Sequence, residues 1–79
     1  MTNEEKTVFY ATAPRAYAGT ISQIIDGNFV TYWVGKLRGK IVSLPGGQYK
    51  FDTKQEAIEC AKSFRKSCID DAKRLGLAL

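Results

Sequence analysis

Apolar residues recur at helical spacing near the C-terminal end of the chain. An apolar stripe with steps of three and four residues runs along one side of residues 53–76, as in an amphipathic helix. The stripe consists of Ala57, Ala61, Phe64, Cys68, Ala72 and Leu75. Thr53-Lys54-Gln55-Glu56 fits a capping box in front of it, and Gly76 fits the C-terminal cap behind it. The pattern predicts a helix over residues 53–75.

Residues 7–51 instead carry β-branched and aromatic residues in short runs divided by glycine and proline. The runs predict strands at 7–13, 19–25, 29–37, 41–44 and 48–51. Turns are expected at Asp26-Gly27-Asn28, Arg38-Gly39-Lys40 and Pro45-Gly46-Gly47. Asp-Gly between two β-rich runs is typical of a two-residue hairpin. We therefore expect an α+β fold, an antiparallel β-meander of four to five short strands with one C-terminal amphipathic helix packed on one face.

The run at 29–37 is apolar on both of its faces. Alternation places Phe29, Thr31, Trp33 and Leu37 on one face, and Val30, Tyr32 and Val34 on the other. A strand that is apolar on both sides normally lies between two layers, yet one helix covers one face. The second face then needs the N-terminal strand, a second copy of the chain (a homodimer), or a partner.

Charge indicates which face looks outward. Lys36 and Arg38 share the side of Tyr32, and charged groups avoid burial. The Trp33 side is therefore expected to face the helix, and the Tyr32 side to face solvent. A bulge at Gly35 would reverse this assignment.

Length and composition indicate one globular domain. The chain has 79 residues, of which 44% are hydrophobic and 25% charged. We expect residues 1–79 to form a single domain, with a flexible start at 1–6, a sheet at 7–51 and the helix at 53–75. The N-terminal residues are acidic and lack the apolar core of a signal peptide, and no apolar run is long enough for a bilayer. These features predict a cytoplasmic protein with no membrane partner.

The sequence offers little catalytic or metal chemistry. It has no histidine, and two cysteines alone do not make a zinc site. Cys60 and Cys68 are eight residues apart on one helix, too far to bridge, and are expected to be small buried thiols. The adjacent Asp70 and Asp71 diverge around a helix and cannot work as a pair. We predict no catalytic residues, no metal, no cofactor and no enzymatic activity.

Basic charge is concentrated between residues 36 and 54, which contain five cations and one acid. The residues expected to bind a partner are Tyr32, Lys36, Arg38, Lys40 and Lys50. Cations beside exposed aromatic rings suit nucleic acid, through phosphate neutralisation and base stacking. They equally suit an acidic protein surface. The alternative without a binding function is a hairpin whose lysines are simply exposed to solvent.

Two resemblances bear on these alternatives. Phe51-Asp52-Thr53 followed by Glu56-Ala57, within residues 46–61, resembles the strand-to-helix junction of phage integrase arm-binding domains and AP2 domains. In those families a three-stranded sheet backed by a helix reads DNA, which implies a DNA- or RNA-binding module here. A small α+β chain without an active site also resembles, in kind, the phage-encoded anti-CRISPR proteins. That resemblance implies a stoichiometric inhibitor of a bacterial nucleic-acid-handling defence complex, with a protein or ribonucleoprotein complex as its partner.

Overall fold

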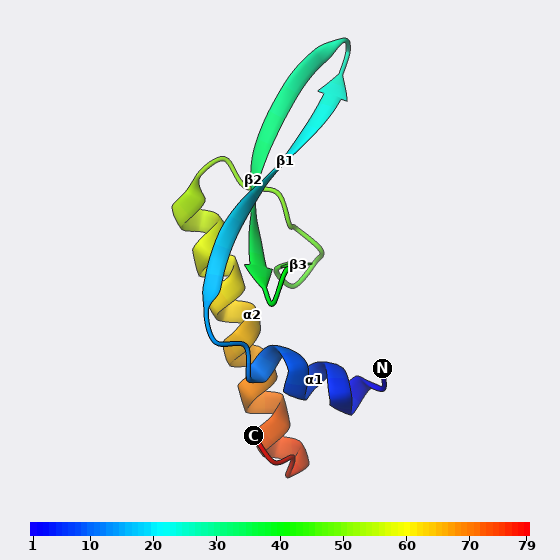
Figure 1. The fold of residues 1–79 in the computed structure, drawn as a ribbon, viewed down its shortest axis with the longest axis vertical. Coiled ribbons are helices and arrows are strands. Elements are labelled where there is room, and N and C mark those ends of the chain that lie inside the picture. The colour runs from blue at the N-terminus through cyan, green and yellow to red at the C-terminus, as the bar shows by residue number, and fades with distance from the viewer.

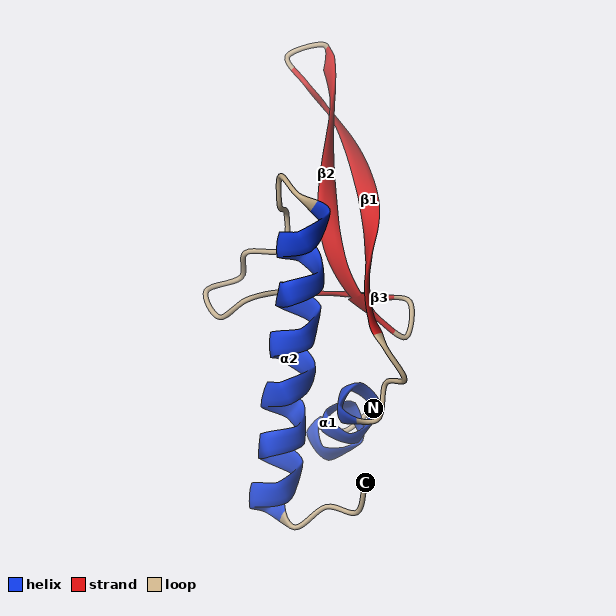
Figure 2. Ribbon diagram, turned by 90° about the vertical axis from the view of Figure 1, so that its left-hand side faces the viewer, coloured by secondary structure: helices blue, strands red, loops and turns tan.

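A three-stranded antiparallel sheet and two helices make up the computed structural model, which describes residues 1–79 (Figure 1). In chain order the elements are α1 (Asn3–Ala11), β1 (Ala16–Ile25), β2 (Asn28–Leu37), β3 (Lys40–Val42) and α2 (Lys54–Leu75). The strands lie in the order β1-β2-β3. α2 crosses one face of the sheet, and α1 lies beside the C-terminal half of α2, beyond the end of the sheet (Figures 1 and 2). No helix is both long enough and apolar enough to cross a bilayer.

The predicted C-terminal helix is confirmed, with Thr53 and Gly76 as its caps, although only the Thr53 half of the expected capping box forms. The Thr53 hydroxyl accepts a hydrogen bond from the Glu56 amide at 3.2 Å, which satisfies one of the free N–H groups of the first turn. The Glu56 carboxylate accepts from the Thr53 hydroxyl at 2.8 Å. At the other end Gly76 adopts the left-handed conformation, with φ of 70°, that closes a helix.

The strand predicted at residues 7–13 is wrong, because residues 7–11 belong to α1 and Thr12 is its C-terminal cap. Thr2 and Glu5 form a reciprocal capping box, which starts the helix within the segment that was expected to be a flexible tail. The Tyr10 ring packs edge-on against Phe64 of α2, with ring centroids 5.1 Å apart. The cap and this tertiary contact outweigh the β-propensity of Val8, Phe9 and Tyr10.

The turns predicted at residues 26–28 and 38–40 are confirmed, and each joins two antiparallel strands. Asp26 and Gly27 have φ of 51° and 78°, and Arg38 and Gly39 have φ of 50° and 78°. Left-handed conformations at both central residues are characteristic of the type I′ turns that suit the twist of a two-stranded ribbon.

The expected count of four to five strands is too high. Residues 41–44 contribute only to the short β3, and residues 48–51 form no strand. Residues 48–51 contact the sheet through one isolated bridge, in which Trp33 and Phe51 exchange backbone hydrogen bonds of 2.9 and 2.8 Å. The α2 cap at Thr53 follows two residues later, so the pairing does not continue beyond Phe51.

The core lies between α2 and the Trp33 side of the sheet, as the charge argument predicts. Leu37, Val42 and Phe51 pack against three small residues of the helix. Those residues are Ala57, Cys60 and Ala61. Gly35 pairs regularly with both neighbouring strands, so it forms no bulge, and it lets β2 approach the helix closely.

The β1–β2 hairpin continues well past the helix as a projecting arm (Figure 1). It gives the molecule principal extents of 49 × 23 × 21 Å. Near its tip, Ile24 and Phe29 are cross-strand partners and are 67% and 79% exposed. α2 begins part-way along the sheet and runs away from the arm, so it leaves this end of the face uncovered (Figure 1).

Candidate partner-binding face

The outer face of the sheet is the side turned away from α2 (Figure 2). Strand register places on it Tyr17, Gly19, Ile21 and Gln23 of β1, Val30, Tyr32, Val34 and Lys36 of β2, and Ile41 of β3. The N-terminal segment does not cover it, because α1 packs against α2 instead. Of the three expected ways to cover this face, the one that used the chain's own N-terminal strand is wrong.

The Lys50 side chain, with Tyr49 beside it, lies over the middle of the outer face. Because Phe51 bridges Trp33, Lys50 lies next to Val34, which is fully buried. The Lys50 ammonium lies 5.1 Å from the centre of the Tyr32 ring and 5.6 Å from that of Tyr49. It also donates to the side-chain oxygen of Gln23 at 3.2 Å. A lysine held between two rings and an amide is well positioned for a cation–π arrangement.

Lys36 extends across the sheet from β2 to β1. A Cβ atom placed on Gly19 would lie 3.1 Å from Lys36 Cε and 3.5 Å from its ammonium nitrogen. Glycine at this position therefore leaves the room in which the lysine lies over β1. The single ion pair of the structure joins Arg74 to Asp71, so no carboxylate neutralises either Lys36 or Lys50.

Arg38 is not part of the outer face, contrary to the sequence-based expectation. Its Nε donates to the carbonyl oxygen of Phe9 at 3.0 Å, and its Nη2 donates to that of Thr12 at 3.1 Å. The guanidinium also lies 5.3 Å from the centre of the Phe9 ring. The left-handed conformation of Arg38 in its turn takes the side chain out of the strand alternation. Its function here is to hold the C-terminal end of α1.

The remaining cations of the basic segment are also dispersed. Lys40 pairs with Leu37, whose side chain faces α2, so register does not place it beside Lys36. Lys54 lies 6.0 Å from the Trp33 ring, again on the helix side. Of the five expected partner-binding residues, the structure brings together Tyr32, Lys36 and Lys50 and separates Arg38 and Lys40 from them.

Three residues that lie beside Lys36 or Lys50 were not singled out from the sequence: Gly19, Gln23 and Tyr49. The positions of Gly19 and Gln23 could have been predicted from the Asp-Gly turn, because a two-residue hairpin fixes the register of β1 against β2. Tyr49 has no comparable local signal, because its position depends on the single bridge at Phe51.

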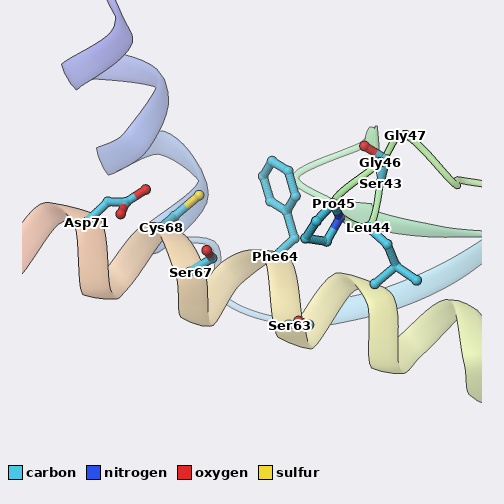
Figure 3. Close-up of a pocket in the computed structure, with 10 residues that line it drawn as sticks. All are labelled: Ser43, Leu44, Pro45, Gly46, Gly47, Ser63, Phe64, Ser67, Cys68 and Asp71. Carbon is cyan, nitrogen blue, oxygen red and sulfur yellow. The ribbon is translucent and has the colours of Figure 1, made fainter.

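A separate hollow of about 430 Å³ lies between α2 and the loop at residues 43–47 (Figure 3). Cys68 and Asp71 lie on its helix side, and the Phe64 ring points toward the loop that holds Pro45. Burial and the Asp71 carboxylate raise the pKa of the Cys68 thiol. The thiol therefore stays protonated near neutral pH, where it is a weak nucleophile.

No group of three or more histidine, cysteine, aspartate or glutamate side chains is arranged to hold a metal ion. Comparison of the chain with protein-family models, with curated proteins and with solved structures finds no match.

Proposed function

We propose that this protein is a non-enzymatic binding protein that occupies an acidic surface of its partner with the outer face of the sheet. The observation that supports this most strongly is a pair of lysines without counter-charges on an apolar, aromatic sheet face. Lys36 and Lys50 would supply the charge, and Tyr32 and Ile21 the apolar contact. Because Lys50 lies over the Tyr32 ring, this arrangement suits a partner surface on which carboxylates lie beside apolar side chains.

The partner that fits best is a protein or a ribonucleoprotein complex. Direct nucleic-acid binding through this face would need free aromatic rings for base stacking. The Lys50 ammonium already lies over both Tyr32 and Tyr49, so a base would have to displace it. Carboxylates need no such displacement, because they can approach the two ammonium groups from solvent. The net charge of +4 would speed the encounter with an acidic surface.

We further propose that the protein inhibits a bacterial nucleic-acid-handling complex in the cytoplasm by binding to it stoichiometrically, as phage-encoded anti-CRISPR proteins do. Such an inhibitor acts by covering a surface and needs no chemistry of its own. The two free cysteines suit a reducing compartment.

The test compares Lys36→Glu with Lys40→Glu, which makes the same charge change away from the outer face. Tagged wild-type and variant proteins are used to purify partners, which are identified and quantified by mass spectrometry. We expect a partner in equal molar ratio to the wild type, retained by Lys40→Glu and lost by Lys36→Glu. Equal retention by both variants would contradict the proposal.

A binding titration separates this proposal from direct nucleic-acid binding. Labelled single-stranded DNA and RNA are titrated with the wild-type protein at several salt concentrations. We expect no saturable binding. Binding that weakens steeply as salt rises, and that Lys36→Glu abolishes, would favour a nucleic-acid-binding module instead.

A further inference from the structure

The outer edge of β1 is an unprotected sheet edge. β1 is the first strand of the order β1-β2-β3, and it pairs with β2 alone over ten residues. None of its residues is charged and none is proline. Proteins usually block such edges with a lysine, a proline, a bulge or a cover. The absence of those devices over a whole strand points to an edge that is kept open for pairing.

The bridge at Trp33 shows which groups of β1 face this edge. Trp33 exchanges both of its backbone hydrogen bonds with Phe51, on the side away from β1. Thr20 is paired with Trp33, and in an antiparallel ladder such a pair directs its N–H and C=O groups away from each other. The same groups of Ala18, Ser22 and Ile24 therefore also point toward the open edge.

Two chemical features flank the edge, one on each face of the sheet. On the outer face the Lys36 ammonium lies over Gly19 without an acidic partner. On the opposite face Ile24 and its cross-strand neighbour Phe29 are exposed. Gly19 and Ile24 are five residues apart, or roughly 17 Å along a strand. An odd spacing places side chains on opposite faces, which is where these two features lie.

We propose that the open edge of β1 accepts an extended acidic segment of the partner as a fourth strand. A carboxylate on that segment lies beside Gly19 and pairs with Lys36. An apolar side chain five residues away packs against Ile24, on the side away from Phe29. Main-chain hydrogen bonds hold the segment, and the two side chains select it, as in other cases of strand addition. This inference rests on the proposed function and specifies how the acidic partner would be recognised.

Charge favours a partner segment over a second copy of this chain. β1 contains no acidic residue, so pairing two β1 edges would bring no carboxylate to Lys36. It would also bring together two molecules that each carry a net charge of +4.

The test selects ligands from a random library of displayed peptides on the immobilised wild-type protein. The enriched peptides are then synthesised with a fluorescent label and their dissociation constants measured. We expect an acidic and an apolar residue five positions apart within a β-prone sequence. Ser22→Pro removes an edge-facing N–H without breaking the β1–β2 ladder, whereas Ser22→Ala removes the same hydroxyl and keeps the N–H. We expect Ser22→Pro to weaken binding by roughly tenfold or more and Ser22→Ala by about twofold or less.

Amide hydrogen exchange of the wild type gives a second readout that needs no variant. The Thr20 and Ser22 amides should exchange rapidly in the free protein and slowly with the selected peptide bound. Unchanged exchange would overturn strand addition even if Ser22→Pro failed to fold.

The outcomes separate the two proposals. If Lys36→Glu abolishes peptide binding while Ser22→Pro leaves it unchanged, the outer face binds acidic partners and strand addition is wrong. If the enriched peptides lack acidic residues and bind Lys36→Glu with the same affinity as the wild type, both proposals are wrong. A wild-type dimer that Ser22→Pro converts to a monomer would assign the edge to a second copy and would also overturn the inference.

Discussion

Arg38 Nη2 donates to two oxygens of Thr12, the main-chain carbonyl at 3.1 Å and the hydroxyl at 3.3 Å. Thr12 is the C-terminal cap of α1, and Arg38 lies in the turn between β2 and β3. The contact therefore joins the first helix to the end of the sheet opposite the projecting arm. A cation at the C-terminal end of a helix also interacts favourably with the helix dipole.

Arg38→Ala should destabilise the protein by about 1–3 kcal/mol, because the Phe9 and Thr12 carbonyls lose charged hydrogen-bond donors. Chemical unfolding measures the change, and hydrogen exchange in α1 locates it. Arg74→Ala is the matched control, since its ion pair with Asp71 is exposed and should contribute less than about 1 kcal/mol. Equal losses in the two variants would contradict the structural role of Arg38.

Gly35→Ala should destabilise the fold by about 1–3 kcal/mol through overpacking. A Cβ atom at this position would clash with the Ala57 carbonyl oxygen and lie 3.1 Å from the Ala61 nitrogen, so the helix would have to move. Gly19→Ala is the control, because its Cβ would meet only the flexible end of Lys36. Thermal unfolding should show a clear loss for Gly35→Ala and little change or a gain for Gly19→Ala. The reverse order would mean that β2 and α2 do not approach as closely as described.

The sequence predicts those elements whose signals are local and mutually consistent. For α2, the Thr53 cap, the apolar stripe and Gly76 all indicate the same helix. Asp26-Gly27 likewise defines the hairpin and its register. For α1 the local signals conflict, since Val8, Phe9 and Tyr10 favour a strand while Thr2 and Glu5 cap a helix. Contact with Phe64, more than fifty residues away, decides the outcome.

On the candidate face too, local patterns predicted some residue positions and long-range contacts determined others. Strand alternation and charge were sufficient to place Tyr32 and Lys36 on the outer face. They misplaced Arg38, because a left-handed turn residue does not continue the alternation and its hydrogen-bond partners lie 26 and 29 residues away. Long-range contacts of this kind are not encoded in any local pattern.

Alkaline pH should destabilise the protein through its two cysteines. Burial raises the pKa of Cys60, and burial together with Asp71 raises the pKa of Cys68, above the ordinary value of 9.0. As pH rises through 9.0, the unfolded chain loses the thiol protons first, so the free energy of unfolding falls. Below that pH the contribution is constant. Urea unfolding between about pH 7 and pH 10 should show a steeper loss for the wild type than for Cys60→Ala/Cys68→Ala. Parallel curves would contradict this assignment.

Phe29 and Phe51 are the same residue type but differ in burial. Alanine substitutions at the two positions can therefore distinguish an effect on binding from an effect on stability. Phe29 is 79% exposed near the tip of the arm, and Phe51 is 5% exposed in the core. Phe51→Ala should therefore lower the free energy of unfolding by about 3–5 kcal/mol. Phe29→Ala should change it by about 0.5 kcal/mol or less.

Phe29→Ala should nevertheless weaken binding of a peptide selected on the wild-type protein, because Ile24, against which the peptide's apolar side chain packs, loses its cross-strand neighbour. Fluorescence titration of the labelled peptide gives the change in affinity, and far-UV circular dichroism confirms that the variant is folded. A second exposed residue serves as the control: Leu75→Ala, at the end of α2, should leave peptide affinity unchanged. If Phe29→Ala behaves like Leu75→Ala, the apolar contact at the arm does not contribute to recognition and only the Lys36 end of the edge does.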